Sequence, residues 1–304
     1  MTVAAGFDLG GTQLKYGLVD ASGAILFKDK VETPKGIEDL TALFGRLYRE
    51  LKAKSPSPVE AVGFGIPGTY DLRRKRILQS PNYPSLDDYD LDPALAREID
   101  VPFRVDNDAN MAAYGEWVDG AGRGVGSLVL LTIGTGIGGG LILGGRLWQG
   151  QCGYGGEAGH IIVRPEGERC ACGLRGCLET EASAPAIVRK YRALSGAGEE
   201  VTAEDVYLRA KAGDIAARRA FAQAGYYLGL GLGIIINLLN PAKILLGGGV
   251  MTTGEFLLEP AAAEARRRSY KQSFACASIE RAALGNDAGL IGAAAWALAG
   301  LVRS

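Results

Sequence analysis

Histidine is almost absent from this chain of 304 residues, which contains one copy, His160. An excess of charge of one sign is absent too, because 33 basic and 34 acidic residues leave a net charge of −1. Proteins whose main partner is nucleic acid carry basic patches or stripes, so this balance argues against that class. We interpret the short basic runs at residues 73–76 and 266–268 as solvated loop and helix faces.

A targeting segment and long apolar runs are also lacking. No cationic stretch followed by an apolar segment and a cleavage site opens the chain. The longest apolar run, residues 226–236, contains several glycines and is shorter than the ~20 residues of a membrane-spanning helix. Five cysteines do not suggest a disulfide framework in a chain of this size. We therefore expect a cytoplasmic protein without a membrane partner.

Glycine, by contrast, is abundant, with 45 copies concentrated in a few runs. A chain accepts the entropic cost of glycine mainly where its backbone turns sharply or approaches a ligand. After an initial antiparallel hairpin, strand and helix patterns alternate, which predicts a mixed α/β fold with the ligand at strand carboxyl ends. We expect strands at residues 3–8, 14–19, 24–31, 60–66, 103–105, 127–133, 139–143, 243–246 and 277–281. We expect helices at residues 37–54, 93–99, 110–118, 184–194, 202–212, 215–239, 256–270 and 289–302.

The first glycine motif, DLGGTQLK at residues 8–15, lies between two expected strands. The main-chain N–H groups of Gly10 and Gly11 can close around phosphate oxygens. Thr12 and Lys15 add a hydroxyl and a cation, and Asp8 can hold a hydrated Mg²⁺. An ordinary hairpin turn is the alternative interpretation, because Gly-Gly turns are common.

The second motif, TIGTGIGGG at residues 132–140, contains the spacing G-x-G-x-x-G. A dinucleotide site needs a helix after these glycines. Here a strand and a turn follow, so we reject that interpretation, and no Walker-type G-x-x-x-x-G-K-[ST] sequence occurs. What remains is a strand–turn–strand hairpin that occurs twice, and two such hairpins facing each other can hold the β- and γ-phosphates of a nucleotide.

Residues 106–108, DND, stand at an expected strand end before a helix. A carboxylate there can accept the proton of an attacking hydroxyl, as phosphoryl transfer requires. The amide beside it can fix a sugar by paired hydrogen bonds. The alternative is that Asp108 or Asn110 is the N-cap of the following helix.

The most specific feature is a set of one histidine and three cysteines within 18 residues: His160, Cys170, Cys172 and Cys177. This donor set suits a tetrahedral structural Zn²⁺, and a loop of free thiols without metal is the alternative. Glu157 and Glu179 bracket the loop and can accept hydrogen bonds from sugar hydroxyls, although surface glutamates are common. A later strand ends in glycines at residues 247–249, which can lie under an adenosine moiety, although many α/β loops share this pattern.

Together these motifs resemble the ROK family (repressors, open reading frames and kinases), and within it the bacterial glucokinases. The similarity covers the chain from Ala5 to about Ala295, and its most specific part is GEAGH at residues 156–160, followed by Cys-x-Cys-x4-Cys and Leu-Glu. The resemblance implies the actin/hexokinase-like (ribonuclease H-like) fold, in which two α/β domains flank a central cleft. We expect a small domain of residues 1–108 plus 288–304 and a large domain of residues 109–287.

The same resemblance implies roles for individual residues. Asp108 would be the catalytic base, with Asn107 and the backbone of Gly68 contacting the sugar. Glu157, His160 and Glu179 would bind hydroxyls near the anomeric end. ATP and Mg²⁺ would contact Asp8, Gly10, Gly11, Thr12, Lys15, Thr132, Gly134, Thr135, Gly136, Gly247, Gly248 and Gly249. Zn²⁺ would be structural, and the chain would form a homodimer.

The expected function is ATP-dependent phosphorylation of the 6-hydroxyl of a hexose, with glucose to glucose 6-phosphate as the first choice. N-acetylglucosamine and N-acetylmannosamine are the alternative acceptors. Tyr154 is bulkier than the usual residue of the family, and Ser183-Ala184 replaces an expected Ser-Gly, which leaves the identity of the sugar open. A sugar-sensing repressor of the family would need an amino-terminal DNA-binding segment, and seven residues precede Asp8. A sugar-binding module without catalysis is the other non-enzyme alternative.

Overall fold

The chain forms two compact units in this computed structural model, which describes residues 1–80, 83–196 and 200–301. The first unit contains Met1–Val125, Gly140–Gly156 and Ala283–Ser304, and the second contains Gly126–Gly139 and Glu157–Ala282. These boundaries differ from the expected division after residue 108. The reason is that the helix beginning at Asp108 packs against the C-terminal helix and stays with the first unit.

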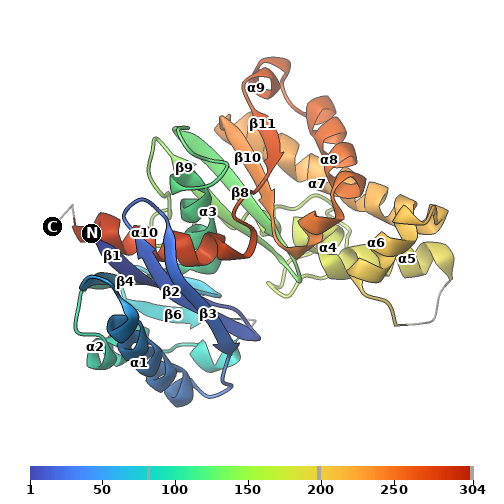
Figure 1. Ribbon diagram of the computed structural model, residues 1–304. Helices are drawn as coiled ribbons and strands as arrows, with labels where there is room; N and C mark the ends of the chain where they lie inside the picture. Colours follow the sequence, from blue (N-terminus) through green and yellow to red (C-terminus); the bar gives the residue numbers. More distant parts are fainter. Residues whose placement is uncertain (81–82, 197–199, 302–304) are drawn as a thin grey trace. The chain divides into compact units, whose positions relative to one another are not determined.

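The first unit is built on a five-stranded sheet with the order β3-β2-β1-β4-β7 (Figure 1). The strands are β3 (Ile25–Glu32), β2 (Gln13–Asp20), β1 (Val3–Leu9), β4 (Val59–Ile66) and β7 (Phe103–Asn107). Strands β1, β4 and β7 are parallel, with Asp8 beside Gly65 and Ile66 beside Asn107. Because the carboxyl ends of parallel strands meet at one edge of a sheet, the polar residues after these three strands are brought together.

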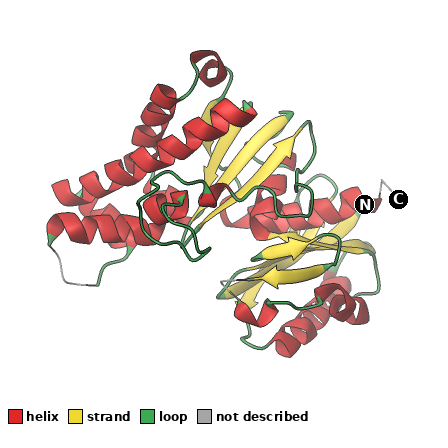
Figure 2. Cartoon of the chain, turned by 180° about the vertical axis from the view of Figure 1, so that it is seen from behind, coloured by secondary structure: helices red, strands yellow, loops and turns green. Residues whose placement is uncertain are grey.

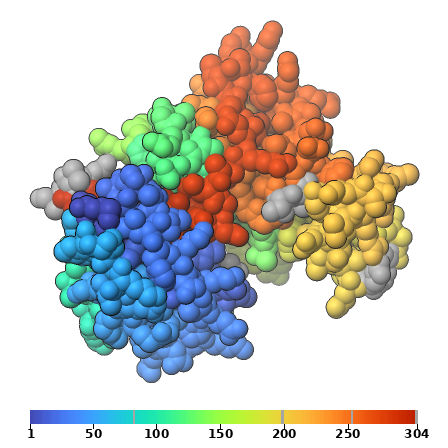
Figure 3. Space-filling model, in the orientation of Figure 1, coloured from blue at the N-terminus to red at the C-terminus, as the bar shows by residue number. Residues whose placement is uncertain are grey.

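Helices cover both faces of this sheet (Figure 2). They are α1 (Ile37–Lys54), α2 (Leu91–Glu98), α3 (Asp108–Val118) and α10 (Ala288–Leu301), with a small hairpin of β5 (Thr69–Asp71) and β6 (Arg76–Gln79) and 3-10 turns at Pro84–Leu86 and Gly285–Asp287. On one face, the rings of Phe7, Phe44 and Phe64 pack with centroids 5.0 to 5.4 Å apart. Alternate residues of a strand point to opposite faces, so Ala4 packs on the other face with α10. In Figure 3, residues of the C-terminal segment (red) lie next to residues of the N-terminal segment (blue).

Two glycines allow α10 to lie directly on the sheet. A Cβ atom on Gly63 would lie 1.8 Å from the carbonyl oxygen of Ala293, and one on Gly6 would lie 2.4 Å from that of Leu290. Backbone atoms cannot rotate away as a flexible side chain can. An alanine at either position would therefore push the helix from the strand.

We expect Gly63→Ala to lower the free energy of unfolding of the first unit by about 3 kcal/mol, the upper end of the cost of overpacking a core. All three tryptophans, Trp117, Trp148 and Trp296, belong to this unit, so intrinsic fluorescence in a urea titration reports its unfolding. Gly65→Ala in the same strand is the control with a smaller expected loss, because its Cβ would meet the flexible side chain of Met111 at 3.3 Å. Equal midpoints for wild type and Gly63→Ala would contradict this packing argument.

Glu116 of α3 anchors two segments of the first unit, one just before the chain first leaves this unit and one where it finally returns. Its side chain is fully buried, and Oε2 accepts the main-chain N–H groups of Ala121 at 3.0 Å and Ala283 at 3.1 Å. Oε1 accepts that of Leu284 at 2.7 Å. Hydrogen bonds to an ionised acceptor are the strong kind, so this carboxylate fixes both segments to α3.

The second unit is built on a four-stranded sheet with the order β11-β10-β8-β9, of which the last strand continues into the first unit at Gly140. The strands are β11 (Ser278–Arg281), β10 (Lys243–Gly247), β8 (Ser127–Ile133) and β9 (Ile137–Leu143). The helices are α4 (Leu178–Ala182), α5 (Ala184–Ser195), α6 (Ala203–Lys211), α7 (Ile215–Leu239), α8 (Glu255–Arg268) and α9 (Lys271–Ala275), with 3-10 turns at Ala158–His160 and Gly249–Thr253. Strands β8 and β10 are parallel with Thr132 beside Gly247, so their carboxyl ends are adjacent.

The apolar run at residues 226–236 belongs to α7, which has 25 residues. By length and composition this helix could span a membrane, with a mean hydropathy of 1.4 over 18 residues, but half of that window is buried. Helices α4, α5, α6 and α8 pack against it, as they would around the core helix of a globular unit. Its glycines serve this packing, since a Cβ on Gly225 or Gly229 would meet Pro260 or Glu264 at 2.6 Å.

Candidate functional site

Polar residues gather at the carboxyl edge of the parallel strands in the first unit. Asn107 ends β7, and its Nδ2 donates to the carbonyl oxygen of Gly68 at 3.0 Å. Gly68 has a φ of +112°, and a Cβ there would lie 2.3 Å from the carbonyl oxygen of Gln79. Only glycine fits this position, so the backbone of Gly68 and the amide of Asn107 form one rigid corner.

Asn107 is also the N-cap of α3, so the interpretation of Asp108 or Asn110 as the cap is wrong. The Oδ1 of Asn107 accepts the main-chain N–H groups of Ala109 at 2.9 Å and Asn110 at 3.2 Å. Asp108 is the first residue of the helix, and its Oδ1 lies 2.9 Å from the N–H of Ala109. The positive end of the helix dipole favours an ionised carboxylate at this place. Asp108 therefore carries a carboxylate that the helix does not need as its N-cap.

Asp106 holds this corner in place by hydrogen bonds, a role that was not predicted from the sequence. Its carboxylate is buried, and Oδ1 accepts the N–H of Asn107 at 2.7 Å and the Nδ2 of Asn110 at 2.8 Å. Oδ2 accepts from the side-chain amide of Gln149. Burial raises the pKa of Asp106, and these donors oppose the rise. No pattern in the sequence connects Asp106 with Gln149, because 43 positions separate them.

The first glycine hairpin joins β1 to β2. The N–H of Gly10 donates to the carbonyl oxygen of Gln13 at 2.9 Å and closes the turn. Asp8 accepts a hydrogen bond from Lys15 Nζ at 3.2 Å. Burial raises the pKa of Asp8, and Lys15 opposes the rise. A cation at this carboxylate would favour its ionised form, as an Mg²⁺ ligand requires.

A cavity of about 700 Å³ opens beside this hairpin within the first unit. It is lined by residues 11–13 of the hairpin, residues 32–35 at the end of β3 and Tyr83–Ser85. The cavity therefore reaches Gly11 and Thr12, two of the residues that the sequence predicts to contact phosphate.

The second hairpin and the glycine loop after β10 are neighbours in the second unit. The N–H of Gly134 donates to the carbonyl oxygen of Gly136 at 2.9 Å. Gly247 pairs with Thr132, and Gly248 has a φ of +87° with Ile133 against it. One nucleotide can thus contact both glycine segments of this unit.

Glu179 braces the second hairpin in addition to lying next to the cysteine cluster. Its Oε2 accepts the N–H of Ile137 at 2.9 Å, and a Cβ on Gly136 would lie 2.3 Å from the same oxygen. Its Oε1 lies 3.7 Å from Cys170 Sγ. The sequence predicts that Glu179 binds a sugar hydroxyl. In the structure its carboxylate also connects the hairpin to the cysteine loop.

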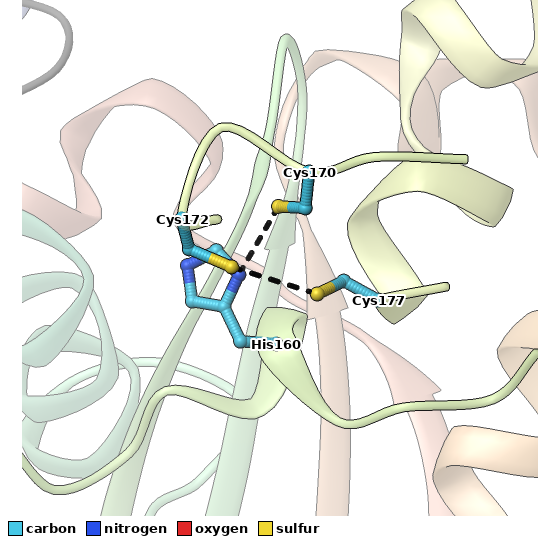
Figure 4. A group of neighbouring side chains, drawn as sticks. All are labelled: His160, Cys170, Cys172 and Cys177. Atoms are coloured by element: carbon cyan, nitrogen blue, oxygen red, sulfur yellow. Dashed lines mark hydrogen bonds between the residues drawn. The ribbon is translucent and has the colours of Figure 1, made fainter. Parts of the chain in front are cut away.

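One histidine and three cysteines converge as the spacing predicted (Figure 4). Their donor atoms all lie within 4.8 Å of one another in His160, Cys170, Cys172 and Cys177. The Sγ atoms of Cys172 and Cys177 are 3.6 Å apart, and Cys170 Sγ is 3.6 Å from His160 Nδ1. A tetrahedral ion with zinc–sulfur bonds of about 2.3 Å places its sulfur ligands about 3.8 Å apart. The cluster can therefore hold a metal ion of that size.

His160 directs its two ring nitrogens to different partners. Nδ1 faces Cys170, and Nε2 lies 3.8 Å from Glu157 Oε2. Burial raises the pKa of Glu157, His160 lowers it, and Glu179 raises it. With a metal ion on Nδ1, the N–H at Nε2 could donate to a hydroxyl of a polyol. The Glu157 carboxylate beside it could accept from a neighbouring hydroxyl.

Comparisons with known proteins show the family of this chain. The family model described as "ROK family" matches residues 4–299. A glucokinase of Halalkalibacterium halodurans is 38% identical over an alignment of 309 positions, which covers 94% of this chain and 92% of that protein. A xylose repressor of Bacillus spizizenii is 30% identical, over 94% of this chain and 74% of that protein.

Solved structures are similar over the whole chain. The ROK hexokinase from Thermus thermophilus has a TM-score of 0.90 and 36% identity, with all of both chains covered. The ROK family glucokinase from Streptomyces griseus, in complex with glucose and AMPPNP, has a TM-score of 0.83 and 34% identity, with 98% of this chain and 99% of that chain covered.

Proposed function

This chain belongs to the ROK family and has the actin/hexokinase-like fold that the sequence predicted, and we propose that it phosphorylates glucose to glucose 6-phosphate with ATP. The observation that carries the proposal is the corner of Gly68, Asn107 and Asp108. There a carboxylate that does not cap its helix stands beside a rigidly held amide. Those are the groups that deprotonation and positioning of a sugar hydroxyl require.

In the proposed reaction, Asp108 takes the proton of the 6-hydroxyl while that oxygen attacks the γ-phosphorus in line. The Asn107 Nδ2 has two N–H donors, of which Gly68 takes one. The second can hold a sugar hydroxyl. Asp106 keeps the main chain of Asn107 in place by accepting its N–H. ATP would bring its γ-phosphate to the two glycine hairpins, and Mg²⁺ beside Asp8 would supply charge neutralisation.

The cysteine cluster would hold one structural Zn²⁺ and take no part in the chemistry. All four protein ligands are present, which is typical of a closed structural site. The ion would fix the ring of His160 through Nδ1 and leave Nε2 for a sugar hydroxyl. Glu157 and Glu179 would bind neighbouring hydroxyls. The support is the donor distances within the cluster.

The acceptor is tested by comparing kcat/KM for glucose, mannose, N-acetylglucosamine and N-acetylmannosamine in an assay coupled to ADP release. We expect the highest value for glucose, because Glu157, His160 and Glu179 supply hydroxyl partners and nothing in the sequence marks an acetamide pocket. A higher value for an acetamido sugar would replace glucose by that substrate class. The absence of turnover with every sugar would favour the sugar-binding regulator, since the xylose repressor shares 30% identity with this chain.

ATP is proposed as the phosphoryl donor because the glycine loop at residues 247–249 lies beside the second hairpin. A polyphosphate has no adenosine and would not use that loop. Equal rates with ATP and polyphosphate would contradict this part of the proposal. We place the reaction in the cytoplasm, where ATP is supplied.

We further propose that the chain forms a homodimer. Three apolar side chains are exposed on the second unit: Ile234 and Leu238, one turn apart on α7, and Tyr270, whose main-chain N–H contacts Asn237 of the same helix, with exposed fractions of 41%, 78% and 66%. Exposed apolar patches often mark protein interfaces. Analytical ultracentrifugation at micromolar concentration should find twice the mass of the chain, and Leu238→Glu should shift the protein toward the monomer.

A further inference from the structure

A cavity of about 550 Å³ in the second unit lies outside the residues discussed so far. It is formed by α5 and α7, which pack side by side (Figure 1), together with α4 and the loop after His160. Three basic side chains line it, Arg164, Arg189 and Lys190, against two acidic ones, Glu168 and Glu181. The volume is in the range of sites for small organic ligands, ~300–1,000 Å³, and the balance of charge favours an anion.

The inner wall of the cavity contains a carboxylate that is buried between two basic side chains. Glu181 is fully buried, and its Oε2 accepts a hydrogen bond from Lys190 Nζ at 2.6 Å. Its Oε1 lies 3.5 Å from Arg164 Nη1 but has no hydrogen-bond donor among the described residues. Buried acceptors are almost always paired. Oε1 has no accessible surface, so the group placed to complete its pairing is the guanidinium of Arg164 and not a ligand.

The guanidinium groups at the rim are accessible. Arg189 is exposed, and 53% of the Arg164 side chain is exposed. Arg189 donates to the carbonyl oxygen of Thr180 through one nitrogen. A guanidinium has five N–H donors, so further donors remain. Arginine binds phosphate through paired hydrogen bonds, and two such groups at one rim suit a phosphate ester.

Two tyrosine rings form the apolar wall. Tyr226 and Tyr227 contact each other edge to face with centroids 5.2 Å apart, and Lys190 Nζ lies 5.0 Å from the centroid of the Tyr227 ring. Tyr226 is 40% exposed although it lines the cavity. An aromatic face gives a large rigid contact area with a polar tip, against which the C–H groups of a saturated ring can pack.

We propose that this cavity binds a phosphorylated sugar. The phosphate contacts Arg164 and Arg189, and the ring packs on Tyr226. Inorganic phosphate would leave the face of Tyr226 uncovered, and an unphosphorylated sugar would leave the guanidinium groups unused. The assignment follows from the lining of the cavity and does not require the chain to be a kinase.

The test is isothermal titration calorimetry of the full chain with glucose 6-phosphate, performed with saturating glucose and AMPPNP so that the proposed catalytic site is occupied. We expect about one equivalent to bind, and Arg164→Ala or Tyr226→Ala to weaken that binding at least about 10-fold, as the loss of one charge-assisted contact predicts. Inorganic phosphate, titrated under the same conditions, should bind at least about 10-fold more weakly. Arg219→Ala is the matched control, because Arg219 is an exposed arginine of α7 outside the cavity lining.

Glucose 6-phosphate binding that is absent, or unchanged by both variants, would overturn the proposal, as would equal affinity for inorganic phosphate. Circular dichroism of each variant excludes misfolding as the cause of a loss. The kinase proposal fails on a different result, the absence of ADP release with every sugar. Glucose 6-phosphate binding that depends on Arg164 would then still support the cavity as a sugar phosphate site.

Discussion

Asp108→Asn is expected to lower kcat toward the upper end of the ~10²–10⁴-fold range typical of general-base catalysis. The substitution keeps the shape of the side chain but removes the group that accepts the proton of the sugar hydroxyl. Binding of glucose, measured by calorimetry or intrinsic fluorescence, should weaken about 10-fold or less, because one hydrogen-bond partner changes character.

The structure sharpens this test. The N-cap of α3 is Asn107, and an asparagine at position 108 still offers an oxygen to the N–H of Ala109, so the helix and the stability of the unit should be retained. Asp119→Asn, at the other end of α3, is the matched control and should leave kcat unchanged. If kcat of Asp108→Asn stayed within a few-fold of wild type, Asp108 would not be the base.

Cys172→Ser is expected to remove the metal ion and to raise KM for the sugar about 10-fold, the loss of roughly one well-placed hydrogen bond. Metal binding at such sites is coupled to local folding. Without the ion, the ring of His160 and the loop to Glu179 lose their common anchor. The kcat should change less, because Asp108 belongs to the other unit. Metal analysis of protein purified without chelator should find about one zinc per wild-type chain, which is what four protein ligands predict.

Cys276→Ser is the control for the metal experiment, since Cys276 is an exposed thiol outside the cluster. It should keep both the zinc content and KM. Removing zinc from the wild-type protein with a chelator should raise KM as Cys172→Ser does. A Cys172→Ser enzyme with full zinc and the wild-type KM would show that the four residues do not form the metal site.

Features encoded over a short stretch of chain were predictable. The helix at Ile37–Lys54, the strand at Ser127–Ile133 and the long helix at Ile215–Leu239 have the predicted bounds, because apolar periodicity is a local property. The convergence of the histidine and the three cysteines follows from donor spacing within 18 residues. The hairpin of β5 and β6 and the short helices α4 and α9 escaped prediction, since they are too short to show a period.

The sequence by itself determined the alternation of strands and helices, the two glycine hairpins and the cluster of one histidine and three cysteines, because each depends on residues close along the chain. Only the tertiary structure decided which residue caps α3 and what supports it. Pairing of β7 with β4 ends the strand at Asn107, and burial brings Gln149 to Asp106. The tertiary structure likewise decided that Glu179 accepts the N–H of Ile137 and that α3 packs against α10. These contacts join residues far apart in the sequence, and their partners are selected by packing and by the need to pair buried polar groups.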